Sequence, residues 1–265
     1  MVRSICAATL SDALQALSEE VAKKEAAGEA NYIFCEDRLT LLAEQAVLKK
    51  SGGTFLSEVS TFARYLKSGK NDKRVLSKEG SVMKINELIT KHKGDGCFTG
   101  PSARAVYETI AQLSASRVSA EDLLSAAENT TGIQGMLQQK LRSLAVIFQE
   151  YDAFLHSSGF IDESGYLSLL PETIKQGNLE NVNVFFFAFP SFTKQALEGV
   201  QEVLRHAKSV TGIFIGGDDA VYTNRALLSF LRAVKEERLF VQETFLISRN
   251  TRSKSASRAQ LRHRT

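Results

Sequence analysis

Hydrophobic and polar residues alternate in blocks along the first part of the chain. Short apolar runs at residues 4–9 and 32–35, and a β-branched and aromatic run at 54–59, predict three strands. Apolar residues at helical spacing follow each run, in three groups: Leu14, Leu17 and Val21; Leu41, Leu42, Ala46 and Leu48; Phe62, Tyr65 and Leu66. Ser11 and Asp12 predict the N-terminal cap of the first helix, which should end near Gly28. Alternating strands and helices indicate a parallel α/β sheet.

The pattern changes to helix alone between residues 69 and 177. Apolar stripes at helical spacing occupy 82–89, 105–113 and 136–154, and Ser119 should cap another helix with acids in its first turn. We predict no strand in this region, which we therefore interpret as an α-helical insertion.

Strands return after the insertion. Residues 182–187, 210–215 and 239–246 predict three more strands, separated by helices at 195–207 and 227–234. We therefore predict a discontinuous α/β domain over residues 1–68 and 178–246, a helical insertion over 69–177, and a basic disordered tail over 247–265.

Charge is concentrated in the tail. Its six basic residues and lack of acids account for the overall charge of +3, because removing them leaves −3 for residues 1–248. The tail could bind nucleic acid electrostatically. Its abrupt composition favours a second interpretation slightly, in which it has no evolved role and results from a frameshift or an artificial chain end.

Cysteine usage and hydropathy indicate the compartment. Cys6, Cys35 and Cys97 form no CxxC pair, and their odd number argues for reducing surroundings. No apolar run approaches the ~20 residues that span a bilayer. We expect a cytoplasmic protein without membrane contact.

The turn after the first strand lacks the chemistry of a phosphate loop. Such a loop needs glycines, a lysine and a Ser or Thr, yet this turn is formed by Ala7, Ala8, Thr9, Leu10 and Ser11. Asp12, which follows, would repel a phosphate. The strand at 182–187 also ends without the carboxylate that would hold magnesium, so we expect no nucleotide, metal or other cofactor.

Other reactive residues are explained by structural roles. His92, His156, His206 and His263 lack partners at metal-ligand spacing and should lie on the surface or at helix ends. Asp218 and Asp219 are expected in a polar loop, and Asp162 and Glu163 at a helix N-terminus. No catalytic site is predicted.

Two stretches of the chain carry recognisable motifs. The first contains Tyr151, Leu155 and Asp162, followed by the strand at 182–187 and a turn with Phe189, Phe192 and Thr193. The second covers residues 32–38, 53–55 and 60–66. Both resemble the N-terminal region of the AddB/RexB subunit of bacterial AddAB-type helicase–nucleases. The chain departs from the family at Ala188, where Asp-Gly is common.

The resemblance implies a P-loop-helicase-like fold that has lost its ATPase and carries the helical insertion as a subdomain. It also implies a DNA double-strand-break-repair complex that is an ATP-dependent helicase and exonuclease, with a motor subunit of the AddA type and single-stranded or forked DNA as partners. Thr61, Phe62 and Arg64 match an element beside single-stranded DNA, and Arg64 and Lys67 are the better candidates for contact. Phe62 fits a core position better, and a solvated helix face is the default explanation of the two cations. The length matches only the first part of such a subunit, so we expect a fragment or truncated product.

Three functions remain open. The favoured one is a non-catalytic scaffold that docks the motor subunit and guides DNA. The alternatives are a nucleotide-binding ATPase or helicase domain and a stand-alone protein-interaction α/β domain.

Overall fold

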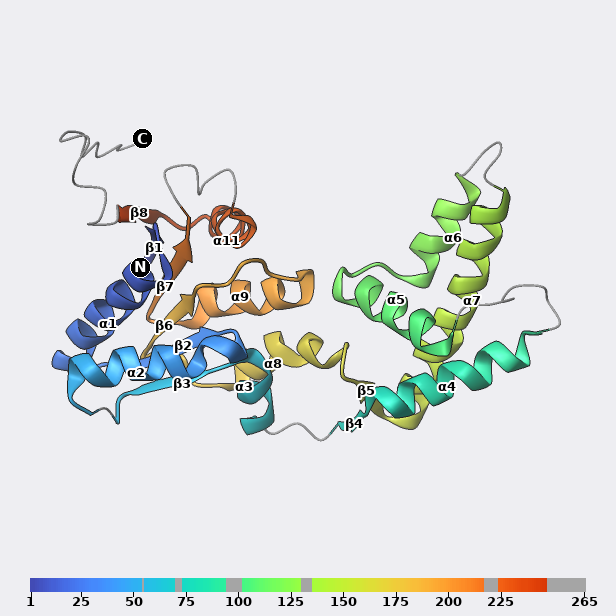
Figure 1. Ribbon diagram of the computed structural model, residues 1–265, viewed down its shortest axis with the longest axis horizontal. Coiled ribbons are helices and arrows are strands. Elements are labelled where there is room, and N and C mark those ends of the chain that lie inside the picture. The colour runs from blue at the N-terminus through green and yellow to red at the C-terminus, as the bar shows by residue number, and fades with distance from the viewer. Residues whose placement is uncertain (54, 70–72, 94–101, 130–134, 217–223, 247–265) are drawn as a thin grey trace. The chain divides into compact units, whose positions relative to one another are not determined.

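The computed structural model describes residues 1–53, 55–69, 73–93, 102–129, 135–216 and 224–246 (Figure 1). The chain forms two compact units. The first comprises Met1–Thr61, Leu179–Ser191 and the residues from Val203 onward, and the second comprises Phe62–Asn178 and Phe192–Glu202.

A six-stranded sheet forms the centre of the first unit. Its strands, in the order in which they pair, are β3 (Ser57–Ser60), β2 (Ala30–Cys35), β6 (Val182–Phe187), β7 (Ser209–Ile215), β1 (Val2–Ala7) and β8 (Val241–Leu246). All neighbouring strands are parallel. The six predicted strands all form, and the α/β fold class with a helical insert is confirmed.

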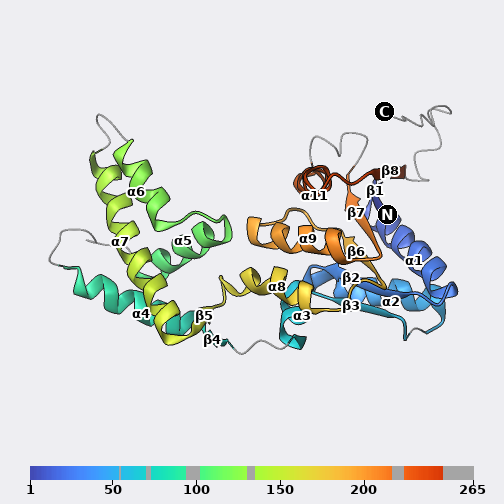
Figure 2. The same ribbon diagram turned by 180° about the vertical axis from the view of Figure 1, so that it is seen from behind.

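The direction of each crossover decides which helix covers which face. Helices α1 (Leu10–Ala26) and α2 (Thr40–Ser51) connect strands toward the β3 edge, whereas α9 (Lys194–His206) and α11 (Arg225–Glu236) connect strands toward the β8 edge. Because parallel crossovers are right-handed, the opposite directions place the two pairs of helices on opposite faces. Figures 1 and 2 show α1 and α11 on the two sides of the sheet.

Alternate residues of the strands build two apolar layers. Ile5, Ile33, Phe185 and Ile213 pack with the buried faces of α1 and α2. On the other face, Phe230 of α11 lies with its ring centre 5.5 Å from that of Phe214 and 6.1 Å from that of Phe186. Strands buried on both faces explain the nearly continuous apolar runs in the sequence.

The second unit is mostly helical. Its elements are α3 (Phe62–Ser68), β4 (Arg74–Leu76), α4 (Lys78–Lys91), α5 (Ala103–Ala115), α6 (Ala120–Glu128), α7 (Gly135–Ser158), β5 (Phe160–Asp162), the 3-10 helix η3 (Tyr166–Leu169) and α8 (Leu170–Gln176). Its core joins α4, α5, α6 and α7 through Ile85, Tyr107, Ile110, Phe148 and Tyr151, among others.

The prediction that the insertion holds no strand is wrong. Strands β4 and β5 pair in parallel, with Arg74 opposite Phe160 and Leu76 opposite Asp162. Each has only three residues, which is too short for alternation to distinguish a strand from a loop.

The predicted domain boundaries stay a prediction. The compact units group α3 and residues 192–202 with the helical part, whereas the sequence assigned them to the sheet. Residues 247–265, predicted as a disordered tail, lie outside the described residues.

Candidate functional site

The turn after β1 lies where an open α/β sheet usually binds ligands. Strands β1 and β7 are neighbours whose following helices run to opposite faces, and a crevice opens at the carboxyl ends of such strands. Here the first turn of α1 is closed by side chains: the Thr9 hydroxyl donates to Asp12 Oδ2 at 2.7 Å and accepts from the Asp12 backbone N–H at 3.2 Å. Ala7 is fully buried, whereas Ser11 is exposed.

Thr9, and not Ser11, is therefore the N-cap of α1. The sequence prediction placed the cap two residues late, because Ser11 and Asp12 are both good capping residues. Asp12 occupies the first turn, where it interacts favourably with the helix dipole. Its carboxylate places negative charge where a phosphate would otherwise approach the helix.

The end of β6 carries a backbone feature that the sequence did not reveal. Ala188 has a φ of 53°, in the left-handed region that glycine adopts without strain. Its N–H donates to the Ile213 carbonyl at 2.8 Å, which holds this conformation. The position where the resemblance expects Asp-Gly thus keeps the glycine-like backbone without either residue.

The four residues singled out as a DNA-contacting element lie at the end of β3 and on α3. Thr61 precedes the helix and is half-buried, and Phe62 is only 7 % exposed, as its core interpretation predicted. Arg64 and Lys67 are exposed on α3.

The histidines lie at helix ends or on the surface, as predicted, for the three that the structure describes. His92 is the C-cap of α4 and lies 2.8 Å from Glu150. His156 lies near the end of α7, 3.7 Å from Asp152, and His206 is the last residue of α9. No three His, Cys, Asp or Glu side chains in the described ranges gather as metal ligands. Asp218, Asp219 and His263 lie outside those ranges.

Asp162 is a buried carboxylate at the end of β5, which corrects its interpretation as a helix N-terminus. Only 4 % of it is exposed. It accepts hydrogen bonds from the Tyr151 hydroxyl at 3.2 Å, from the Ser164 hydroxyl at 2.9 Å and from the Gly165 backbone N–H at 2.7 Å. These bonds tie the long helix α7 to β5.

Two buried tyrosines surround this carboxylate. The rings of Tyr107 and Tyr151 meet edge to face, with centres 6.4 Å apart. Burial and the nearby charge of Asp162 raise the pKa of both phenols, so both keep their protons at neutral pH. The family resemblance includes Tyr151 and Asp162 at this spacing. In the structure the hydroxyl of Tyr151 donates a hydrogen bond to Asp162.

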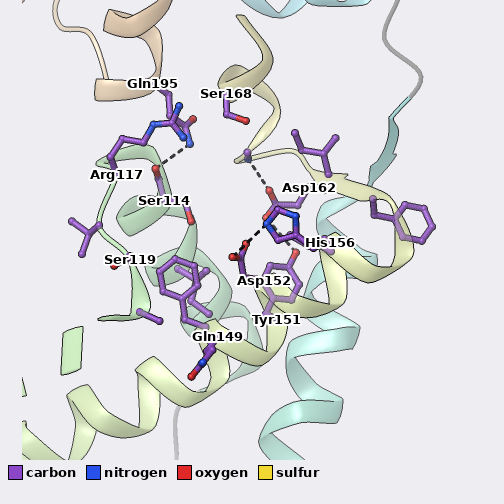
Figure 3. Close-up of a pocket in the computed structure, with 18 of the residues that line it drawn as sticks. Ser114, Arg117, Ser119, Gln149, Tyr151, Asp152, His156, Asp162, Ser168 and Gln195 are labelled. Atoms are coloured by element: carbon purple, nitrogen blue, oxygen red, sulfur yellow. Dashed lines mark hydrogen bonds and ion pairs between the residues drawn. The ribbon is translucent and has the colours of Figure 1, made fainter. Parts of the chain in front are cut away.

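A cavity of about 430 Å³ lies beside this cluster, within the second unit. Residues of α5, α7, β5, the segment 117–121 and the start of α9 line it (Figure 3). Gln195 of α9 is 2 % exposed, and its Nε2 donates to the Ser114 carbonyl at 3.0 Å. Its Oε1 is buried and has no hydrogen-bond partner among the described residues. Sequence reasoning missed this cavity, because Gln195 fits one polar position of an amphipathic helix and nothing marks it as different from the others.

The amino ends of the strands hold a network of polar side chains. Asn183 is fully buried and donates to Glu29 and Asn31, while the Ser209 hydroxyl donates to Asn183 at 2.6 Å. Hydrogen bonds from Lys208 and Asn183 lower the pKa of Glu29 to about 2. Buried polar side chains of neighbouring strands thus satisfy one another at this edge.

No helix in the described part of the chain is both long and apolar enough to cross a membrane.

These features define a class of protein: an α/β domain with a six-stranded parallel sheet, a helical insert, and a first β–α turn in which Thr9 and Asp12 are bonded to each other. A family model described as "ADDB, N-terminal" matches residues 11–230. The chain belongs to this AddB N-terminal family.

Curated relatives described as one subunit of an ATP-dependent helicase/deoxyribonuclease are similar to this chain. The protein of Listeria monocytogenes serotype 4a is 28 % identical over 74 % of the chain, and that of Listeria welshimeri is 25 % identical over 92 %. The protein of Moorella thermoacetica is 26 % identical over 70 %. The chain spans only 18 %, 23 % and 18 % of these relatives' own lengths, respectively.

Proposed function

We propose that the chain is a non-catalytic module of a helicase–nuclease subunit that acts in cytoplasmic DNA break repair. In this role it docks a motor subunit of the AddA type and helps to guide single-stranded or forked DNA. The β1–α1 turn carries the proposal, because the hydroxyl of Thr9 and the carboxylate of Asp12 are bonded to each other there.

The backbone N–H groups and the charge of this turn both disfavour nucleotide binding. A phosphate loop needs free backbone N–H groups, a lysine and a hydroxyl for magnesium. In this turn the Asp12 N–H is bonded to Thr9, the sequence offers no lysine, and a carboxylate occupies the first helical turn. A module with this turn contributes to a helicase complex by shape and contacts, not by ATP hydrolysis.

The DNA-guiding part of the proposal rests on the exposed cations of α3. Arg64 and Lys67 are three positions apart on the helix, a spacing that places both on one side. Two cations on one helical side can meet successive phosphates of a strand. Phe62 supports this helix from the core and need not stack on a base.

A thermal-shift titration with ATP and magnesium tests whether the chain binds nucleotide. Ligand binding to the folded state raises the melting temperature, by an amount equivalent to about 2.7 kcal/mol at a hundredfold excess over Kd. We expect no shift for the full chain up to millimolar ATP. A saturable shift that Thr9→Ala abolishes would instead establish the nucleotide-binding alternative.

A reconstitution with the motor subunit tests the scaffold role. The full chain should co-purify with that subunit and increase the affinity of the pair for forked DNA. Arg64→Ala combined with Lys67→Ala should reduce the dependence of log K on log salt by about 1 for each lost phosphate contact. The matched control is Lys140→Ala with Arg142→Ala, two cations of α7. No association with the motor subunit and no effect on DNA would favour the stand-alone interaction domain.

A further inference from the structure

Gln195, one of the residues that line the cavity of the second unit, has an acceptor that the described residues do not satisfy. Gln195 Oε1 is buried without a partner among the described residues, while the Nε2 of the same amide is held by Ser114. A buried polar atom left without a hydrogen bond is destabilising, because it has lost its hydration without gaining a partner. Because Ser114 fixes the amide orientation, the oxygen cannot exchange places with the nitrogen without losing that bond.

The charged groups around the cavity give it an acidic surplus. Asp152 and Glu121 line it together with the buried carboxylate of Asp162. The lining also holds two cations, Arg117 and Lys73. Two nitrogens of Arg117 are hydrogen-bonded to Glu198, which lies outside the lining. With Arg117 paired to Glu198, Lys73 is the lysine or arginine of the lining that can offset these carboxylates.

Asp152 is the carboxylate best placed to receive a ligand. Its side chain is 59 % exposed, and it pairs with His156 at the long distance of 3.7 Å. Asp162, in contrast, already accepts from Tyr151, Ser164 and Gly165. Figure 3 shows Asp152, His156 and Tyr151 on one wall and Gln195 extending from another toward Ser114.

We propose that this cavity binds a guanidinium group. An unsatisfied amide oxygen and an acidic surplus both favour a positively charged hydrogen-bond donor. A guanidinium offers five N–H donors in a planar fork, so one group can donate to an amide oxygen and to a carboxylate. Phe160 and Leu155, which are half-buried in the lining, provide apolar surface for its alkyl stem.

The volume of the cavity is large enough for either of two guanidinium-bearing ligands. A cavity of about 430 Å³ lies within the range for small-molecule sites. It can hold an arginine side chain with part of its backbone, offered by a segment of a partner protein, or a free guanidino compound. The inference does not depend on the proposed scaffold role, because it can be tested on the chain alone.

Calorimetric titration of the full chain tests the proposal with three probes. N-acetyl-arginine amide represents the protein source, agmatine the free compound, and N-acetyl-citrulline amide is the neutral isostere. We expect saturable binding of at least one guanidinium probe, and binding of citrulline amide at least tenfold weaker. Tighter binding of arginine amide than of agmatine would assign the site to a protein segment, and the reverse order to a small molecule.

Two variants locate the binding. Gln195→Met removes the buried acceptor and should weaken binding about tenfold or more, the effect of losing a hydrogen bond to a charged group. Asp152→Asn changes an exposed residue that the fold does not need and should weaken binding about threefold. The controls are Gln112→Met and Glu79→Gln, both outside the cavity lining.

Three outcomes would overturn the proposal. They are absence of binding to both guanidinium probes, equal binding of the citrulline isostere, and guanidinium binding that neither variant weakens. Failure to join the motor subunit would leave all of these measurements unchanged.

Discussion

The turn after β1 and the cavity beside β5 differ in how their polar atoms are used. At the sheet end, Thr9 and Asp12 bond to each other and the Ala188 N–H is bonded to Ile213. In the cavity, Gln195 retains a buried acceptor with no partner among the described residues. The place where this kind of fold usually binds a ligand is thus closed by its own side chains, and the helical insertion offers the less satisfied site. Fold-level analogy alone points to the turn after β1 and passes over this cavity.

The largest expected effect concerns the cluster that supports the cavity. Asp162→Ala leaves the Tyr151 hydroxyl, the Ser164 hydroxyl and the Gly165 N–H without their acceptor in a buried place. We expect a loss of about 3 kcal/mol in the free energy of unfolding, measured by urea denaturation.

The control for this change is Asp152→Ala, in the same helical unit but exposed. It should cost less than about 0.5 kcal/mol, because exposed ion pairs contribute little. Equal effects of the two substitutions would show that Asp162 is not the anchor between α7 and β5.

The sequence predicted the sheet better than the cluster for a physical reason. The four inner strands, β2, β6, β7 and β1, are buried on both faces and mostly apolar, so composition alone locates them. The edge strand β3 is half exposed and carries Glu58, so its position was predicted less closely. The cluster is joined to α7 by a contact between Tyr151 and Asp162, eleven residues apart, and no periodicity predicts such a contact. The family resemblance contained both residues but not the bond between them.

Helix α2 shows where hydrophobicity misled the prediction. The expected apolar stripe contained Leu41, Leu42 and Leu48, which are 62 %, 41 % and 47 % exposed. The buried face is made by smaller residues, Ala43 and Val47, which pack against the sheet and α1. Small side chains allow close helix–sheet packing, and a pattern that weights residues by hydrophobicity passes over them.

The second prediction tests the closed turn. Thr9→Ala removes the N-cap of α1 and should cost about 1 kcal/mol, the usual value of a capping hydroxyl. Ser11→Ala, which the sequence alone would have ranked as the capping change, should leave the unfolding free energy within about 0.5 kcal/mol. A larger loss at Ser11 than at Thr9, again by urea denaturation, would restore the original assignment of the cap.

The third prediction concerns the end of β6. Ala188→Gly relieves a left-handed backbone that costs a non-glycine residue about 1–2 kcal/mol, and loses the burial of one methyl group, about 0.8 kcal/mol. We expect a net gain of about 0.5 kcal/mol in thermal or urea unfolding. Ala226→Gly, inside helix α11, should instead lose about 1 kcal/mol. A loss at both positions would contradict the left-handed conformation of Ala188.

The smallest effect is expected at the amino edge of the sheet, where Glu29 is held by Lys208 and Asn183. These bonds lower the pKa of Glu29 to about 2, below the value near 4.5 of the unfolded chain. The unfolded state therefore binds the proton more tightly, so the stabilisation is complete above pH 4.5 and is lost as the pH falls toward 2. Glu29→Gln should lower stability at pH 7 and lose most of that difference by about pH 2.5, in urea titrations at several pH values.

Glu44→Gln, an exposed change in the middle of α2, leaves this network intact and serves as the control. A pH-independent difference for Glu29→Gln would mean that the side chain contributes by packing and not by its charge. In that event the amino edge would be held by Asn183 and its neutral hydrogen bonds alone.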